Sequence, residues 1–289
     1  MKLYAPSTIR EIKDRYGFKL TKSLGQNFLT DKNIIDKIIE GAAIGEDDLV
    51  IEVGPGIGVI TYEASLAARK VIAVEIDRNL IPILAETLAE RDNIEIVNSD
   101  ILKTDVNELI AEARKNDGTL KNVQIIGNLP YYITTPIIMK LLEEGVEADG
   151  ITVMMQKEVA DRIKAVPNTK AYGALSVAVQ YYCEVETVVN VPKEVFIPQP
   201  QVDSTVLRLN IRKEKAVRAV SDEMFFRVVK AGFGQRRKTL SNSLMGVEGI
   251  SKEIVKDALE AAGIEPTRRA ETLNLEEFAE LANQVSLRL

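Results

Sequence analysis

Histidine and tryptophan are both absent from this 289-residue chain, and cysteine occurs once, as Cys183. Without histidine there is no Ser-His-Asp or Cys-His nucleophilic machinery and no histidine-ligated metal site. One cysteine permits no internal disulfide and no cysteine cluster, so we expect no metal and a buried thiol in a reducing, cytoplasmic compartment.

Long apolar runs are missing as well. None approaches the roughly 20 residues that a membrane-spanning helix needs, so no membrane association is expected. The first 20 residues have no uninterrupted apolar core, so no signal peptide is expected either. An apolar content of 46% with 28% charged residues instead predicts a soluble globular protein of one large or two unequal domains.

The net charge of −6 argues against a uniformly basic nucleic-acid binder, but the charge is unevenly distributed. Residues 1–30 carry six basic and two acidic residues, residues 212–289 carry 14 and 12, and the middle therefore holds −12. The binding of a polyanion such as a nucleic acid depends more on local patches of positive charge than on the net charge of the protein. We therefore treat 1–30 as a basic N-terminal arm, with a mixed solvated surface as the open alternative.

Short β-branched runs alternate with helix-compatible stretches between residues 49 and 156. The expected strands are 49–53, 70–76, 94–98, 122–126 and 150–156, and the expected helices are 31–43, 59–69, 78–90 and 135–144. Such alternation predicts βαβ units and a parallel sheet covered on both faces. Later in the chain we expect a helix at 172–183 and strands at 184–191 and 205–211.

The pattern changes after Arg212. Only helices are expected there, at 222–231, 239–244, 252–262 and 275–284, joined by turns that contain glycine or proline. We place a domain boundary near residue 212, which divides the chain into the arm, an α/β domain at 31–211 and a helical domain at 212–289.

Three features follow successive expected strands. The first strand leads into Gly54-Pro55-Gly56-Ile57-Gly58, where glycines let a ligand approach the backbone. The second ends at Glu75, about 20 residues past the first glycine, where a carboxylate can accept both ribose hydroxyls. The third is followed by Asp100, which can accept a hydrogen bond from an adenine amino group. Together they predict a nucleoside site.

The fourth strand leads into GNLPYYITTP, residues 127–136. This turn places a primary amide, Asn128, beside a stiff proline and two tyrosines, where an ordinary loop would use small polar residues. With the glycine turn and the two acids, it resembles S-adenosylmethionine-dependent methyltransferases that act on exocyclic amino groups.

A closer resemblance covers nearly the whole chain. LGQNFL (24–29), EVGPGIG (52–58), MMQKEVADR (154–162), VFIPQPQVDS (195–204) and FGQRRKTLSNSL (233–244) are similar to the ribosomal RNA adenine dimethyltransferase family. The resemblance implies a Rossmann-like class I methyltransferase sheet with a smaller helical C-terminal domain. It further implies S-adenosyl-L-methionine as cofactor and 16S rRNA of the small ribosomal subunit as partner, with a role in subunit biogenesis. We also expect a monomer.

The resemblance also assigns residues. The cofactor-binding positions that it implies are Gln26, Asn27, Leu29, Gly54, Gly56, Glu75, Asp100 and Asn128. The catalytic turn comprises Asn128, Leu129, Pro130 and Tyr131, and Phe196 corresponds to an aromatic that covers the target base on its other face. We expect Tyr132 only to cap the core.

RNA contacts are expected from a segment rich in cations, FFRVVKAGFGQRRKTL at 225–240. It has no acidic residue, and its cations would release counterions from the phosphate backbone. These cations are Arg227, Lys230, Arg236, Arg237 and Lys238. A solvated helix end is the alternative interpretation.

Three other functions stay open. A relative acting on large-subunit rRNA, which confers macrolide resistance, shares QNFL and the Asn-x-Pro-Tyr turn, although GIEPTRRAETLNLEEFAELAN (263–283) favours the housekeeping branch. A ribosome-assembly factor whose binding matters more than its catalysis is a second. A nicotinamide-dependent oxidoreductase is a third, but the G-x-G-x-G spacing argues against it.

Overall fold

The computed structural model describes residues 2–17, 26–235, 237–245, 247 and 249–289, which form two compact units. The first unit comprises Met1–Ala160 and Val185–Ile211, and the second comprises Asp161–Glu184 and Arg212–Leu289. Among the described residues, no helix is long and apolar enough to cross a bilayer.

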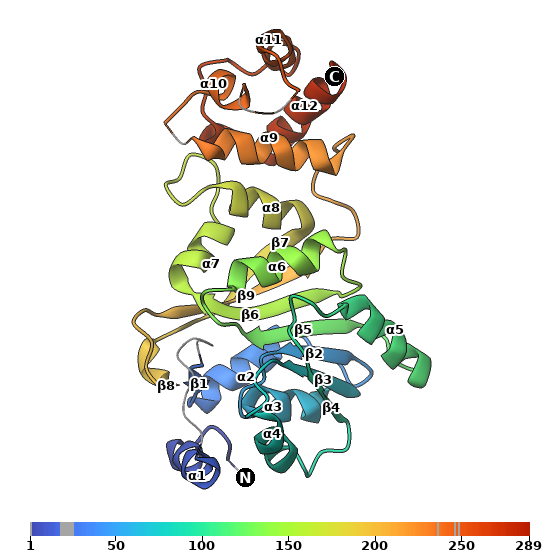
Figure 1. Cartoon of the computed structure of the whole chain (residues 1–289), viewed down its shortest axis with the longest axis vertical. Coiled ribbons are helices and arrows are strands. Elements are labelled where there is room, and N and C mark those ends of the chain that lie inside the picture. Colours follow the sequence, from blue (N-terminus) through green and yellow to red (C-terminus); the bar gives the residue numbers. More distant parts are fainter. Residues whose placement is uncertain (1, 18–25, 236, 246, 248) are drawn as a thin grey trace. The chain divides into compact units, whose positions relative to one another are not determined.

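The first unit contains a seven-stranded sheet in the order β4-β3-β2-β5-β6-β9-β7 (Figure 1). Its strands are β2 (Leu49–Val53), β3 (Lys70–Glu75), β4 (Ile94–Asn98), β5 (Val123–Asn128), β6 (Gly150–Gln156), β7 (Cys183–Val191) and β9 (Ser204–Ile211). The pairs from β4 through β6 are parallel, which confirms the predicted α/β sheet. β9 pairs with β6 antiparallel, so the sheet is mixed.

Helices connect the strands of this sheet. They are α2 (Lys32–Gly41), α3 (Val59–Ala67), α4 (Ile81–Thr87), α5 (Val106–Asn116), α6 (Thr134–Glu143) and α7 (Lys157–Ile163). α2 begins where the Asp31 carboxylate accepts hydrogen bonds from two backbone N–H groups, and it buries Ile34, Ile35 and Ile38. All five residues of β2 are buried, so both faces of the sheet centre are covered.

The N-terminal arm contains a helix that the sequence analysis did not predict, α1 (Pro6–Tyr16). Proline at its first position and Gly17 in the left-handed conformation after its end delimit it. Ile9 and Ile12 are buried in the hydrophobic cluster of the first unit, so this part of the arm packs on the α/β core. A two-stranded ribbon of β1 (Phe28–Leu29) and β8 (Phe196–Ile197), preceded by a 3₁₀ turn (Lys193–Val195), lies in the same unit.

The second unit is helical. It contains α8 (Ala174–Tyr182), α9 (Asp222–Gly234), α10 (Leu240–Leu244), α11 (Lys252–Ala261), a 3₁₀ turn (Ala270–Thr272) and α12 (Leu275–Ser286). Ser221, Ser251 and Asn274 cap the amino ends of α9, α11 and α12 with side-chain acceptors.

The extent of the second unit differs from the single boundary expected near residue 212, because residues 161–184 belong to it as well. The cause is the packing of α8. Tyr181 is fully buried and stacks on Phe225 of α9 at 4.5 Å between ring centroids. Cys183, at the start of β7, is buried as expected, and burial raises the pKa of its thiol to about 12.

Candidate active site

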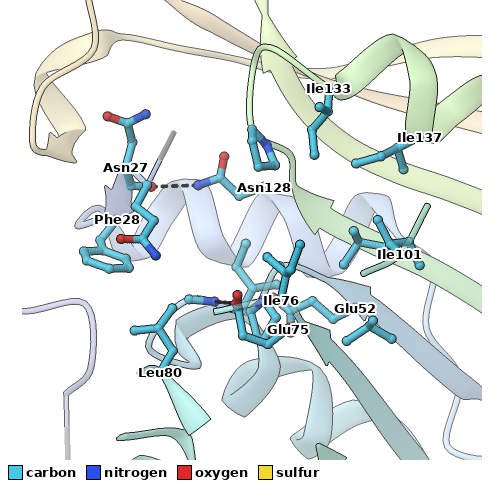
Figure 2. A pocket seen from close by; sticks show the side chains of 18 of the residues that line it. Asn27, Phe28, Glu52, Glu75, Ile76, Leu80, Ile101, Asn128, Ile133 and Ile137 are labelled. Atoms are coloured by element: carbon cyan, nitrogen blue, oxygen red, sulfur yellow. Dashed lines mark hydrogen bonds between the residues drawn. The ribbon is translucent and has the colours of Figure 1, made fainter. Parts of the chain in front are cut away.

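A cleft opens at the carboxyl ends of β2, β3 and β5 and at the turn after β4 (Figure 2). It encloses about 940 Å³ of space, including its solvent-open mouth. Parallel strands bring their carboxyl ends to one edge, which is why residues far apart in the sequence meet here. All eight predicted cofactor positions line this cleft: Gln26, Asn27, Leu29, Gly54, Gly56, Glu75, Asp100 and Asn128.

The glycine turn after β2 has the backbone conformation that its composition predicts. Gly54, Gly56 and Gly58 all have positive φ, at 71°, 62° and 87°. A Cβ at Gly54 would meet no atom within 4 Å, whereas one at Gly56 would come within 3.0 Å of the Phe28 ring. Gly54 thus exposes its backbone to the cleft, and Gly56 permits close packing of β1.

Glu75 is held at the end of β3 by backbone donors. Its Oε1 accepts a hydrogen bond from the Asp77 N–H at 2.8 Å, and its Oε2 accepts one from the Gly56 N–H at 3.4 Å. Burial nevertheless raises the pKa of the Glu75 carboxyl. Gln26 joins this group because its Nε2 donates to Asp77 Oδ2 at 2.9 Å. The carboxylate is fixed in place rather than free to rotate.

Asp100 lies in the turn after β4, with about a quarter of its side chain exposed. Its Oδ1 accepts a hydrogen bond from the Leu102 N–H at 3.0 Å. Apolar walls beside the two acids come from Ile76, which is 52% exposed, and from Ile101. Neither isoleucine was predicted, although Ile76 directly follows Glu75 at the end of β3 and Ile101 directly follows Asp100 in the turn after β4. An apolar wall beside a carboxylate suits a flat base with a polar edge.

The side-chain amide of Asn128 has a fixed orientation. Its Nδ2 donates to the backbone carbonyl of Asn27 at 2.8 Å, which turns Oδ1 away from Asn27 (Figure 2). Asn27 precedes β1, and Asn128 is the last residue of β5, so the end of the arm meets the end of the fourth strand of the parallel set. This contact leaves the oxygen side of the amide as the acceptor for a ligand in the cleft.

The turn after Asn128 divides its residues between the core and the cleft. Leu129 is 1% exposed, and its N–H donates to the Met154 carbonyl at 3.2 Å, while Pro130 lines the cleft. The Tyr131 hydroxyl is 2.7 Å from Ser204 Oγ, and burial raises the pKa of this phenol. The expectation that Tyr132 caps the core is wrong, because Tyr132 is 57% exposed and lines the cleft.

Phe196 is not brought to the cleft. Its side chain is 2% exposed within the core of the first unit, and Phe196 pairs with Leu29 in the β1–β8 ribbon. The sequence analysis expected this ring to cover a target base. In the structure the ring instead packs in the hydrophobic core of the first unit.

A further acid, Glu52, was missed because it stands inside the apolar run LVIEV. It is 1% exposed, and it lines the cleft. Burial raises the pKa of its carboxyl to about 8, and the charge of Glu75 adds to the rise. The nearby Thr61 hydroxyl lowers the pKa of Glu52 in part. The two groups do not form a hydrogen bond of normal geometry, and among the described residues neither Thr61 Oγ1 nor Glu52 Oε2 has another hydrogen-bond partner.

The predicted RNA contacts lie in the second unit, in a cationic segment that we define as residues 225–240. Arg227 and Lys230 lie on α9, and Lys230 is exposed. Arg237 and Lys238 are exposed between α9 and α10, and Arg236 lies outside the described residues.

The sequence matches the family model described as ribosomal RNA adenine dimethylase over residues 17–286. It is 52% identical over 288 residues to the ribosomal RNA small subunit methyltransferase A of Clostridioides difficile (strain 630), covering 100% of this chain and 98% of the relative. The protein of the same name from Bacillus pumilus (strain SAFR-032) is 51% identical over 281 residues, with 96% and 95% covered.

Solved structures agree with the sequence comparison. A dimethyladenosine transferase from Plasmodium falciparum superposes with a TM-score of 0.74 at 26% identity, covering 88% of this chain and 95% of that one. The 23S rRNA methyltransferase ErmE superposes with a TM-score of 0.67 at 29% identity, covering 90% and 99%. The α/β sheet, the cleft at its strand ends and the match over nearly the whole sequence lead to one conclusion: this chain belongs to the ribosomal RNA adenine dimethylase family.

Proposed function

We propose that the protein uses S-adenosyl-L-methionine to dimethylate the N6 amino groups of two adjacent adenosines near the 3′ end of 16S rRNA. Full-length relatives at about half identity are named as small-subunit enzymes, whereas the 23S enzyme is only 29% identical, which favours the small subunit. We expect the protein to act as a monomer in the cytoplasm during subunit biogenesis. The orientation of the Asn128 amide in the cleft carries the proposal.

The residues of the cleft fit the cofactor. At Gly54 the space that a side chain would fill is open, so a ligand can approach the backbone. Glu75 provides a fixed carboxylate for the ribose hydroxyls. Asp100, beside the apolar Ile76 and Ile101, suits an adenine. When bound, S-adenosylmethionine supplies an electrophilic methyl group on a sulfonium whose leaving group is a neutral thioether. No acid has to protonate that leaving group, which suits a chain without histidine.

Asn128 prepares the nucleophile. The lone pair of an adenine N6 is delocalised into the ring, and the Asn128 Oδ1, together with the Leu129 carbonyl, would accept its hydrogens and favour a pyramidal amine. Pro130 stiffens the turn through its fixed φ. Positioning of this kind can contribute roughly 7–11 kcal/mol to the acceleration. The methylated amine then releases its proton to water.

Aromatic stacking would hold the target base. Flipping an adenine out of its stack costs a few kcal/mol, and stacking on a ring returns roughly 1–3 kcal/mol. Tyr131 is anchored through its hydroxyl to Ser204, and Tyr132 presents an exposed ring at the cleft. A monomethylated N6 keeps only one N–H, so the second transfer would depend more on stacking and less on the two acceptors.

The test is a methyl-transfer assay on undermodified 30S subunits with a labelled donor, followed by digestion of the RNA. N6,N6-dimethyladenosine in the small-subunit RNA is the expected product. Undermodified 50S subunits serve as the parallel substrate. Methylation of the 50S subunits alone would contradict the proposal and favour the large-subunit activity.

A further inference from the structure

Ser204 is a buried hydroxyl residue in contact with the catalytic turn. Its Oγ lies 2.7 Å from the Tyr131 hydroxyl, a normal distance for a hydrogen bond between two hydroxyl groups. Ser204 is the first residue of β9, and none of its surface is exposed. Among the described residues its hydroxyl makes no other hydrogen bond. A buried hydroxyl needs a partner, and here that partner is the tyrosine of the turn.

The backbone around Ser204 is fixed by the same strand that fixes the turn. β6 lies between β5, which leads into the turn, and β9, which begins with Ser204 (Figure 1). The Leu129 N–H donates to the Met154 carbonyl of β6, and Ser204 pairs with Gln156 of β6. Tyr131 therefore reaches past β6 from one neighbouring strand to the other, and both ends of its side chain are attached to the sheet.

The half-buried Tyr131 stands beside the cofactor cleft rather than in it. Pro130 and Tyr132, its neighbours in the chain, belong to the described lining of the cleft, whereas Tyr131 does not. A ring in this place can contact a base that approaches Asn128 without occupying the space of the cofactor. A tyrosine ring can turn about two side-chain torsions, and a hydrogen bond at its far end restricts both.

We propose that Ser204 is a positioning residue that acts through Tyr131, and that its hydroxyl holds the Tyr131 ring in the orientation that stacks on the target adenine. The inference rests on the proposed function, because the stacked base is the adenine of the RNA. A monomethylated N6 keeps one N–H and depends more on stacking. Loss of the Ser204 hydroxyl therefore slows the second methyl transfer more than the first, and N6-monomethyladenosine accumulates.

Single-turnover methylation of undermodified 30S subunits tests this, with the monomethyl and dimethyl products quantified over time. Ser204→Ala and Tyr131→Phe remove the same hydrogen bond from its two ends. Each should slow the second transfer about fivefold, the effect of one net hydrogen bond, and the first by less than about twofold. The affinity for S-adenosylhomocysteine, measured by calorimetry, should stay at the wild-type value.

A double variant and a matched control separate positioning from stability. The combination of Ser204→Ala with Tyr131→Phe should be no slower than either single variant, because only one hydrogen bond is lost. Thr205→Val removes the hydroxyl of the next residue of β9, which is equally buried and donates to Asn190 Oδ1 at 3.0 Å instead of to the turn. It should give the wild-type ratio of monomethyl to dimethyl product.

Three results would overturn the inference and leave the proposed function intact. They are a wild-type product ratio from Ser204→Ala, additive effects in the double variant, and an equal shift of the ratio by Thr205→Val. If Ser204→Ala does not fold, Tyr131→Phe decides the outcome, since a wild-type product ratio from that variant would also overturn the inference. Failure of the wild type to form any N6,N6-dimethyladenosine would overturn the proposed function as well.

Discussion

The cleft of the first unit and the cationic segment of the second unit present polar groups in opposite ways. In the cleft, the Glu75 carboxylate accepts a hydrogen bond from a backbone N–H group, and the Asn128 amide donates one to a backbone carbonyl. In the cationic segment, Lys230, Arg237 and Lys238 are exposed on the surface. A side chain that is fixed in place binds a ligand in one orientation, whereas exposed cations attract phosphate groups in many orientations. The comparison predicts steep, local effects in the cleft and graded, salt-dependent effects in the second unit.

The largest effect is expected from Asn128→Ala. Loss of a positioned hydrogen-bonding group in the transition state should lower kcat by about 10²- to 10³-fold. Binding of S-adenosylhomocysteine, measured by calorimetry, should fall by less than about tenfold. Asn107→Ala removes a half-buried amide outside the cleft lining, which donates to Gly145 O and accepts from the Glu147 N–H, and it should leave both quantities unchanged. Equal losses of kcat and of cofactor affinity would contradict a role in orienting the amine.

Glu52→Gln should change the pH dependence of stability. The folded pKa of Glu52, about 8, lies above its ordinary value, so the folded state holds this proton more tightly than the unfolded state. The contribution of this bound proton to the free energy of unfolding is fully present below about pH 4.5 and is lost as the pH rises through about 8. Denaturant unfolding of the ligand-free proteins should therefore show wild type losing a few kcal/mol relative to Glu52→Gln between pH 5 and pH 8. A constant difference would contradict the raised pKa.

Charge reversal of the cationic segment should act on RNA alone. The double variant Arg236→Glu with Arg237→Glu should weaken 30S binding roughly 10- to 100-fold and lower the salt slope by about 1–2. Cofactor affinity should not change. Reversal of the exposed Lys252 and Lys256 on α11 is the control for general charge effects. Equal weakening by both double variants would assign the effect to net charge.

The smallest effect is expected at Gly54. Alanine there and alanine at Gly17 meet the same backbone strain, since φ is 71° and 58° and neither Cβ would touch an atom within 4 Å. Each should lower the free energy of unfolding by about 1 kcal/mol. Only Gly54→Ala should weaken S-adenosylhomocysteine binding, roughly tenfold, because its methyl group would enter the space of the ligand. Equal cofactor binding by both variants would remove Gly54 from the site.

Much of the fold and the centre of the site could be predicted from the sequence because their signals are local. The strands at 49–53, 94–98 and 150–156 show as apolar β-branched runs, and they were confirmed without change of bounds. Parallel pairing then brings Gly54, Glu75, Asp100 and Asn128 to one edge, with no further information needed.

The residues whose positions differ from the predictions are placed by contacts between distant parts of the sequence. The β1–β8 ribbon pairs residues 167 and 169 positions apart in two-residue strands, which are too short to leave a pattern, so the burial of Phe196 was not foreseen. The Tyr131 hydroxyl meets Ser204 on β9, 73 positions further along the chain, a contact that the sequence does not reveal. Glu52 was overlooked because a single acid within an apolar strand leaves the periodicity of that strand unchanged.

The hydrogen bond between Asn27 O and Asn128 Nδ2 has a chemical consequence. An amide rotated by half a turn would point its own hydrogens at an incoming amine, setting donor against donor. The Asn27 carbonyl disfavours that rotamer, since two oxygens would then confront each other. Aspartate at position 128 would suffer the same oxygen–oxygen repulsion in either rotamer, so the nitrogen of this side chain is as necessary as its oxygen.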